Sequence, residues 1–212
     1  LFDFVVEPLN EKYNSEIKVY DKSLITNVDL DNFRAVSNMA KVIEVPLALN
    51  TSIKKGDTII IHHNVFRTFR DIRGKQKASR SKFIDNLYLV TMDQVYMYKS
   101  KEVWKTVNNR CFVKPLLDNN DLTLDKEREL IGILKYGNSS LEALKITPGD
   151  LIGYTPDGEY EFFINGERLY CMKSNDIVIK YEYQGDEVEY NPSWSKSSWR
   201  INQGGRRKDR WL

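Results

Sequence analysis

The residues that most often carry out chemistry are scarce in this sequence. Its 212 residues include two adjacent histidines, His62 and His63, and two cysteines, Cys111 and Cys171. A zinc site needs about four soft or imidazole ligands, and without a C-x-x-C pair it would have to recruit distant carboxylates. Each cysteine lies in an apolar, strand-like run, where a buried thiol is the ordinary interpretation. We expect no metal, no disulfide framework and no cofactor.

Motifs that build catalytic sites are also missing. The chain contains no G-x-S-x-G nucleophile elbow, no P-loop, no G-x-G-x-x-G and no H-E-x-x-H. These motifs bring a nucleophile, a phosphate cradle or a pair of zinc ligands to one place. We therefore expect a protein that is not an enzyme and that works by binding.

The elements that would position any binding site are predicted to be strands. Short runs of β-branched and aromatic residues bounded by Gly, Asn, Asp and Pro occur throughout, whereas helical periodicity is weak, which predicts an all-β fold. Asn165-Gly166 favours a tight hairpin, because both central residues of a type I′ turn adopt positive φ. The predicted strands span residues 4–8, 40–45, 58–62, 87–90, 95–98, 110–114, 131–135, 151–154, 159–164, 167–172 and 177–183.

Four sequence landmarks occur twice in the same order. They are a strand ending in Pro-Leu, an apolar strand, a Gly-Asp element before an apolar run, and a Leu-Tyr pair before the last strand. Such self-similarity indicates a duplicated unit. The matching segments are 5–9 with 112–116, 42–45 with 131–134, 53–59 with 146–152, and 87–88 with 169–170.

The repeat predicts two barrels and a tail. We expect one barrel over residues 1–101, a second over residues 102–185, and a Trp-rich basic tail over residues 186–212. The net charge of +2 is a sum of unlike parts, because residues 1–101 carry 16 basic and 12 acidic groups and residues 102–185 carry 10 and 14. No apolar run reaches the roughly 20 residues that span a bilayer. With no leader-like N-terminus and few cysteines, the sequence favours the cytoplasm.

Each copy resembles the GroES family of co-chaperonins. In that family a long loop follows the first strand, a Gly-Asp element precedes a later strand, and a Ser-Asp-Ile-type strand closes the chain. Gly56-Asp57, Gly149-Asp150 and residues 173–179 match these features. The resemblance covers residues 2–183 and is closest to the tandem members found in phages. It implies two GroES-like β-barrels in a homo-oligomeric ring, heptameric in the family.

The resemblance also implies a binding segment. The family grips the rim of a chaperonin ring through a short aliphatic stretch in its mobile loop, and Ser23, Leu24, Ile25 and Thr26 resemble that stretch. The surrounding residues 10–39 are too polar to bury, which leaves two aliphatic side chains for a partner. Alternatively, Leu24 and Ile25 pack back onto the barrel as an ordinary loop anchor. At the corresponding position, the second copy has only the short segment 117–130, which is rich in acidic residues. We therefore expect the second copy not to grip a chaperonin.

Two further segments need an interpretation. Residues 66–82 hold seven basic residues, one acidic residue and two phenylalanines, a mixture that can bind nucleic acid. A solvated surface loop is the simpler interpretation, so we do not expect nucleic acid among the partners. The tail holds three of the four tryptophans, which favours docking of part of it on a barrel or on a neighbouring subunit.

The leading hypothesis is a phage-encoded co-chaperonin that caps a host chaperonin ring in the cytoplasm. The capped chamber then assists the folding of a client such as a capsid protein, an assignment inherited from the resemblance. The competing hypothesis is a GroES-like structural or virion protein, or an assembly protein, that no longer binds a chaperonin. The shortened loop of the second copy and the Trp-rich tail motivate this alternative.

Overall fold

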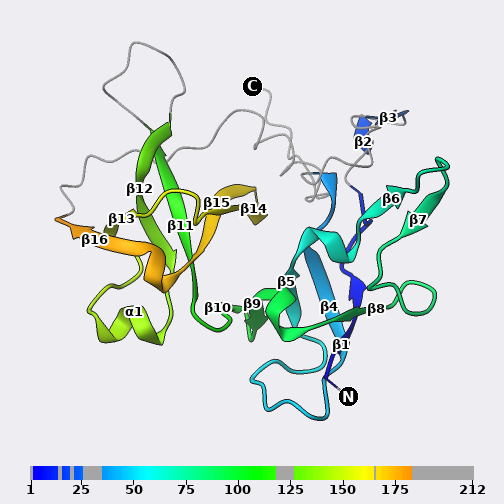
Figure 1. The fold of residues 1–212 in the computed structure, drawn as a ribbon, viewed down its shortest axis with the longest axis horizontal. Coiled ribbons are helices and arrows are strands. Elements are labelled where there is room, and N and C mark those ends of the chain that lie inside the picture. The colour runs from blue at the N-terminus through cyan, green and yellow to red at the C-terminus, as the bar shows by residue number, and fades with distance from the viewer. Residues whose placement is uncertain are drawn as a thin grey trace, which may run out of the picture. The chain divides into compact units, whose positions relative to one another are not determined.

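The computed structural model describes residues 2–13, 16–19, 22–25, 35–117, 127–164 and 166–182 (Figure 1). The chain divides into two compact units, Leu1–Arg110 and a second unit that begins at Cys111. The strand β10 (Val103–Thr106) pairs with β9 (Val95–Ser100) of the first unit. The first unit therefore continues past residue 101, where the sequence pattern alone places its end. No helix among the described residues is long and apolar enough to cross a membrane.

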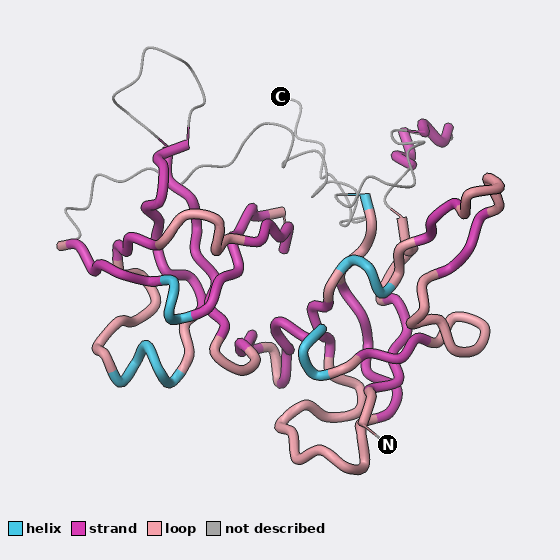
Figure 2. The backbone as a smooth tube through the Cα atoms, in the orientation of Figure 1, coloured by secondary structure: helices cyan, strands magenta, loops and turns pink. Residues whose placement is uncertain are grey.

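The described residues confirm the all-β class. The main sheet of the first unit has the order β10-β9-β5-β4-β1-β8, with β1 at Phe4–Pro8, β4 at Met39–Glu44, β5 at Thr58–Ile61 and β8 at Tyr88–Val90. Two separate hairpins accompany it (Figure 2). One joins β2 (Glu16–Val19) to β3 (Lys22–Ile25), and the other joins β6 (Thr68–Arg70) to β7 (Gln76–Ala78). Short 3-10 turns, η2 (His63–Val65) and η3 (Met92–Gln94), follow β5 and β8.

The sheet of the second unit has the order β14-β15-β11-β12-β13-β16. One short helix, α1 (Ser139–Ala143), and a 3-10 turn, η4 (Ser174–Asp176), connect its strands. Asn138 caps α1 by accepting hydrogen bonds from the backbone N–H groups of Ser140 and Leu141. The strands are β11 (Arg110–Leu117), β12 (Glu127–Tyr136), β13 (Leu151–Tyr154), β14 (Tyr160–Ile164), β15 (Glu167–Lys173) and β16 (Ile177–Tyr181).

Both sheets contain the same five-strand core in the same order. The order β9-β5-β4-β1-β8 of the first unit corresponds to β16-β13-β12-β11-β15 of the second. Irregularities recur at matching points, between Val5 and Val6 and between Phe112 and Val113 on the first strand of each copy. The pairing of the third strand with the last strand also shifts at the same step in both units. The repeat read from the sequence is therefore a repeat of strand order and register.

The Gly-Asp elements have the same geometry in both units. Gly56 and Gly149 have φ values of 90° and 99°, which L side chains rarely adopt, so glycine is required there. Asp57 accepts a hydrogen bond from the Lys54 N–H (2.9 Å), and Asp150 accepts one from the Thr147 N–H (2.7 Å). Each element is thus a carboxylate-closed turn that ends at the start of the third core strand.

One part of the predicted alignment is wrong. The sequence pattern matches Val42 with Ile131, but Val42 pairs with Val6 as Leu134 pairs with Val113, so Val42 corresponds to Leu134. The N–H groups of Gly56 and Gly149 donate to the carbonyl oxygens of Val42 and Leu134, which confirms this register. Residues 130–134 are nearly all apolar, so their pattern does not indicate which of them face the core.

The predicted barrels are also wrong, because both sheets are open in the part of the chain that the structure describes. Closing the five-strand core would require β9 to pair with β8 in the first unit, and β16 to pair with β15 in the second. The outer side of β9 is already paired with β10, and that of β15 with β14. An added strand therefore occupies one closing edge in each unit.

All eleven predicted strands are present. The hairpin predicted at Asn165-Gly166 joins β14 to β15, with Ile164 paired to Glu167 and a positive φ at Gly166; Asn165 lies outside the described residues. Each unit has its own apolar core, centred on Phe4, Ile59 and Tyr88 in the first and on Val113, Ile152 and Tyr170 in the second. Tyr88 and Tyr170 occupy corresponding strands, as their Leu-Tyr landmarks predict.

Candidate binding segments

The stem of the long loop between β1 and β4 is fixed to the first unit. The Leu9 N–H donates to the Met39 carbonyl (3.1 Å), and the Ser37 N–H donates to the Lys12 carbonyl (2.8 Å). Tyr13 and Val36 form an isolated antiparallel β-bridge. The hydroxyl of Tyr13 accepts a hydrogen bond from the Thr68 N–H (2.7 Å), and its ring packs against the core. Val36 is buried. The chain therefore leaves and re-enters the sheet at a closed, anchored base.

Beyond this stem the structure describes the β2–β3 hairpin, which carries most of the predicted binding segment. Ser23, Leu24 and Ile25 lie on β3, where they pair with Lys18, Ile17 and Glu16 of β2. Thr26 lies outside the described residues. The alternative, in which Leu24 and Ile25 anchor the loop to the body, remains a prediction, as does the chaperonin-binding role.

The corresponding connection of the second unit is much shorter. In the first unit, residues 9–38 connect β1 to β4. In the second unit, only residues 118–126, which lie outside the described residues, connect β11 to β12. Leu117 pairs with Glu127, so β11 and β12 run together up to this connection. The two copies therefore present different segments at the same topological position.

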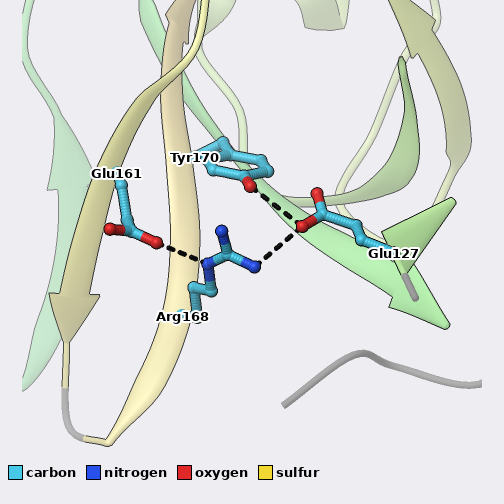
Figure 3. Close-up of polar contacts among 4 residues, drawn as sticks. All are labelled: Glu127, Glu161, Arg168 and Tyr170. Carbon is cyan, nitrogen blue, oxygen red and sulfur yellow. Dashed lines mark hydrogen bonds and ion pairs between the residues drawn. The ribbon is translucent and has the colours of Figure 1, made fainter. Parts of the chain in front are cut away.

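A polar cluster lies at the point where this shorter connection enters β12 (Figure 3). Arg168 of β15 donates from Nε to Glu161 of β14 (2.6 Å) and from Nη1 to Glu127 of β12 (2.7 Å). The Tyr170 hydroxyl also donates to Glu127 (3.0 Å), and the Arg168 guanidinium lies 5.0 Å from the centre of the Tyr170 ring. The cluster links three strands of the second sheet.

The electrostatics of this cluster fit a structural clamp. Burial raises the pKa of Glu127, although Arg168 and Tyr170 act in the opposite direction. Burial also acts against the charge of Arg168, but Glu127 and Glu161 outweigh it, so the pKa of the guanidinium is raised. The Arg168 guanidinium between two carboxylates holds both of them through charge-assisted hydrogen bonds.

The two histidines lie side by side, and both cysteines are buried. The rings of His62 and His63 stack with centres 4.5 Å apart, both half-buried, and burial is the main cause that lowers the pKa of His63 to about 4. Burial also raises the pKa of Cys111 to about 12. Among the described residues, no group of three His, Cys, Asp or Glu side chains could hold a metal ion.

No protein-family profile matches this chain, and no curated protein matches it. The function is therefore inferred from the sequence pattern and from the geometry of the described residues. Sequence reasoning identified the long loop, but it missed the cluster around Arg168. Glu127, Glu161 and Arg168 are 34 and seven residues apart along the chain, and only the register of three strands brings them together.

Proposed function

We propose that this chain is a co-chaperonin that caps a chaperonin ring through the loop between β1 and β4. Ser23, Leu24, Ile25 and Thr26 form the contacting segment in this proposal. The observation that carries it is the asymmetry of the duplicated sheet, since a long, anchored loop leaves the first copy where the GroES-type mobile loop belongs. The second copy has a short connection at that point.

The energetics of the hairpin favour this role. Ordering a loop costs roughly 1–2 kcal/mol per residue in backbone entropy, which weakens any single loop as a ligand. The β2–β3 pairing already restrains the backbone from Lys22 to Ile25, so part of this cost is met before binding. Several loops on one homo-oligomeric ring would then raise the affinity by about 10² to 10⁴. We therefore propose that the active form is a ring, as the resemblance to the GroES family implies.

The proposal includes the phage-type biology of tandem family members. The capped partner would be a host chaperonin of the GroEL type in the host-cell cytoplasm, and the client a phage protein such as a capsid subunit. These assignments rest on the resemblance of the two copies to tandem co-chaperonins. The duplicated core, with its matched Gly-Asp turns, supports that resemblance without a closed barrel.

Binding to a bacterial chaperonin ring in the presence of nucleotide tests this function. The Leu24→Asp/Ile25→Asp variant should lose binding in a pull-down, because charged side chains cannot enter an apolar rim site. Leu47→Asp/Leu144→Asp is the matched control, since both leucines are well exposed outside the loop. Equal binding by the wild type and the loop variant would refute the segment, and absence of binding by the wild type would refute the function.

A structural or assembly protein is the second candidate. The observation that favours it is the short connection of the second copy, which leaves each chain with one long loop for two copies of the fold. In this case the protein would occur at a fixed stoichiometry in purified particles and would form no complex with a chaperonin. Native mass spectrometry separates the two candidates, because capping requires a ring of the free protein.

A further inference from the structure

The β6–β7 hairpin is a separate two-stranded arm of the first unit. Phe69 pairs with Lys77 and Arg70 with Gln76, and Figure 2 shows both strands leaving the six-stranded sheet. The Asp71 carboxylate closes the turn by accepting hydrogen bonds from the N–H groups of Arg73 and Lys75, both 2.9 Å long. Gly74, with a φ of 75°, completes this turn. The arm therefore has a defined tip.

The base of the arm is firmly attached. Phe66 is buried, with its ring edge-on to Tyr88 at 4.9 Å, and the Ser79 hydroxyl donates to the Val65 carbonyl. After the arm, the Ser81 carbonyl accepts a hydrogen bond from the Leu89 N–H of β8 (2.8 Å). An arm with an anchored base holds its side chains in place before a partner arrives, which lowers the entropy lost on binding.

The arm carries a strong positive charge. Residues 66–82 contain seven basic groups and one acidic group, so their formal charge is 7 − 1 = +6. The single carboxylate, Asp71, is engaged by the turn and lies 3.3 Å from the Lys77 ammonium. Arg70, Arg73 and Lys75 are exposed near the tip. The field around the tip is therefore that of several unneutralised cations.

Large apolar side chains are exposed among these cations. Ile72 at the tip is fully exposed, Phe69 is 39% exposed, and Phe83 and Ile84, which follow the arm, are each more than half exposed. Exposed apolar side chains beside unneutralised cations can form a contact surface. An acidic protein surface would neutralise the charge of the arm, but its carboxylates would not stack on the rings of Phe69 and Phe83.

From this combination we propose that the β6–β7 arm binds single-stranded nucleic acid. Arg and Lys side chains contact the phosphates, while Phe69 and Phe83 offer faces on which unpaired bases stack. A duplex keeps its bases stacked on one another, so its phosphates could engage the arm but its bases could not. Single strands should therefore bind more tightly than duplex of the same length. This activity is separate from chaperonin capping, because it uses none of residues 23–26.

Fluorescence anisotropy with the full chain and a labelled 20-nucleotide poly-dT strand tests the proposal. Phe69→Ala/Phe83→Ala should weaken binding at least about fivefold for each stacked base lost. Arg70→Gln/Arg73→Gln should reduce the slope of log K against log salt by about 1.4, or 0.7 for each phosphate contact. Lys41→Gln/Lys54→Gln, which removes two exposed cations elsewhere on the first unit, should leave both quantities unchanged.

Several outcomes would overturn this inference. They are absence of binding by the wild type, equal affinity for duplex and single strand, and equal weakening by the Lys41/Lys54 control. Poly-glutamate of matched charge that competes as well as poly-dT would show recognition of charge alone and would also overturn it. Circular dichroism of each variant confirms folding, which the exposure of the substituted side chains leads us to expect.

Discussion

Replacing Arg168 with methionine tests how much the polar cluster contributes to the second unit. Methionine retains much of the side-chain volume but leaves Glu127 and Glu161 without the cation that contacts both. The three charged side chains are only 11–22% exposed. Removing one partner of a buried ion pair costs about 3–5 kcal/mol, and the partial exposure places this case at the lower end, at about 3 kcal/mol.

The loss should also depend on pH in a defined direction. Burial already raises the pKa of Glu127, and Arg168 is the largest influence that opposes it. Without Arg168 this pKa rises further, so the folded variant binds a proton more readily than the unfolded chain. When a carboxyl group has a higher pKa in the folded state than in the unfolded state, the protein becomes less stable as the pH increases through these values. The variant should therefore lose the most stability relative to the wild type at neutral pH. It should regain stability as the pH falls and Glu127 becomes protonated.

Urea unfolding of the full chain, followed by circular dichroism between pH 4 and pH 7, measures this effect. Hydrogen exchange of the β12 and β15 amides assigns the loss to the second unit. Arg128→Met is the matched control, because Arg128 is exposed on the same strand as Glu127. A loss below about 0.5 kcal/mol at pH 7, as for exposed ion pairs, would refute the reasoning. So would a loss that does not change with pH.

Two further predictions follow from the repeat and from the histidine pair. Gly56→Ala and Gly149→Ala should each destabilise the protein by about 1–2 kcal/mol, because a residue with a side chain adopts positive φ at a cost. Thermal unfolding measures this loss. An effect no larger than that of the control Gly137→Ala would contradict the prediction. Because burial lowers the pKa of His63 to about 4, the unfolded chain binds its proton first, so stability should fall between pH 6.5 and pH 4. His63→Asn should flatten this part of the profile in urea unfolding, and an unchanged profile would rule out the assignment to His63.

The sequence predicted the strands of the sheet core well because each carries large apolar residues bounded by turn residues. The Gly-Asp turns were predictable for a similar reason, since glycine and aspartate each have a specific backbone role there. The sequence pattern missed β2, β3, β6, β7 and β10. β6 and β7 have no buried side chains, and β2, β3 and β10 each lie at the edge of a sheet. Their pairing depends on partners that periodicity does not reveal.

Register and closure could not be predicted either. The pattern of residues 130–134 is apolar at almost every position, so a three-residue misalignment with Val42 fits the sequence as well as the observed pairing. Barrel closure depends on whether an edge strand meets its counterpart or an added strand. The pairing of β10 with β9 and of β14 with β15 decides against closure. Asn165-Gly166 predicts the second of these pairings, but not that β14 occupies the edge that closure requires.

The two copies also differ in the connection before their Leu-Tyr strand, and this difference bears on the arm. In the second unit the connection contains β14, whose Phe162 and Ile164 are buried and which pairs with β15 at the sheet edge. In the first unit the same connection contains β6 and β7, which pair with each other and have mostly exposed side chains.

The edge of β8 is nevertheless covered in the first unit. Residues after the arm take this position, through the bridge of Lys82 to Tyr88 and the hydrogen bond from Leu89 to Ser81. The edge of β8 therefore does not need β6 or β7 as a pairing partner. A segment that is ordered and basic, that exposes apolar side chains and that does not pair with the sheet is better explained by a partner than by packing. Removing residues 69–77 keeps Thr68 and its hydrogen bond with Tyr13. With the flanking chain joined by a short Gly-Ser linker, this deletion should leave the first unit folded while abolishing nucleic-acid binding.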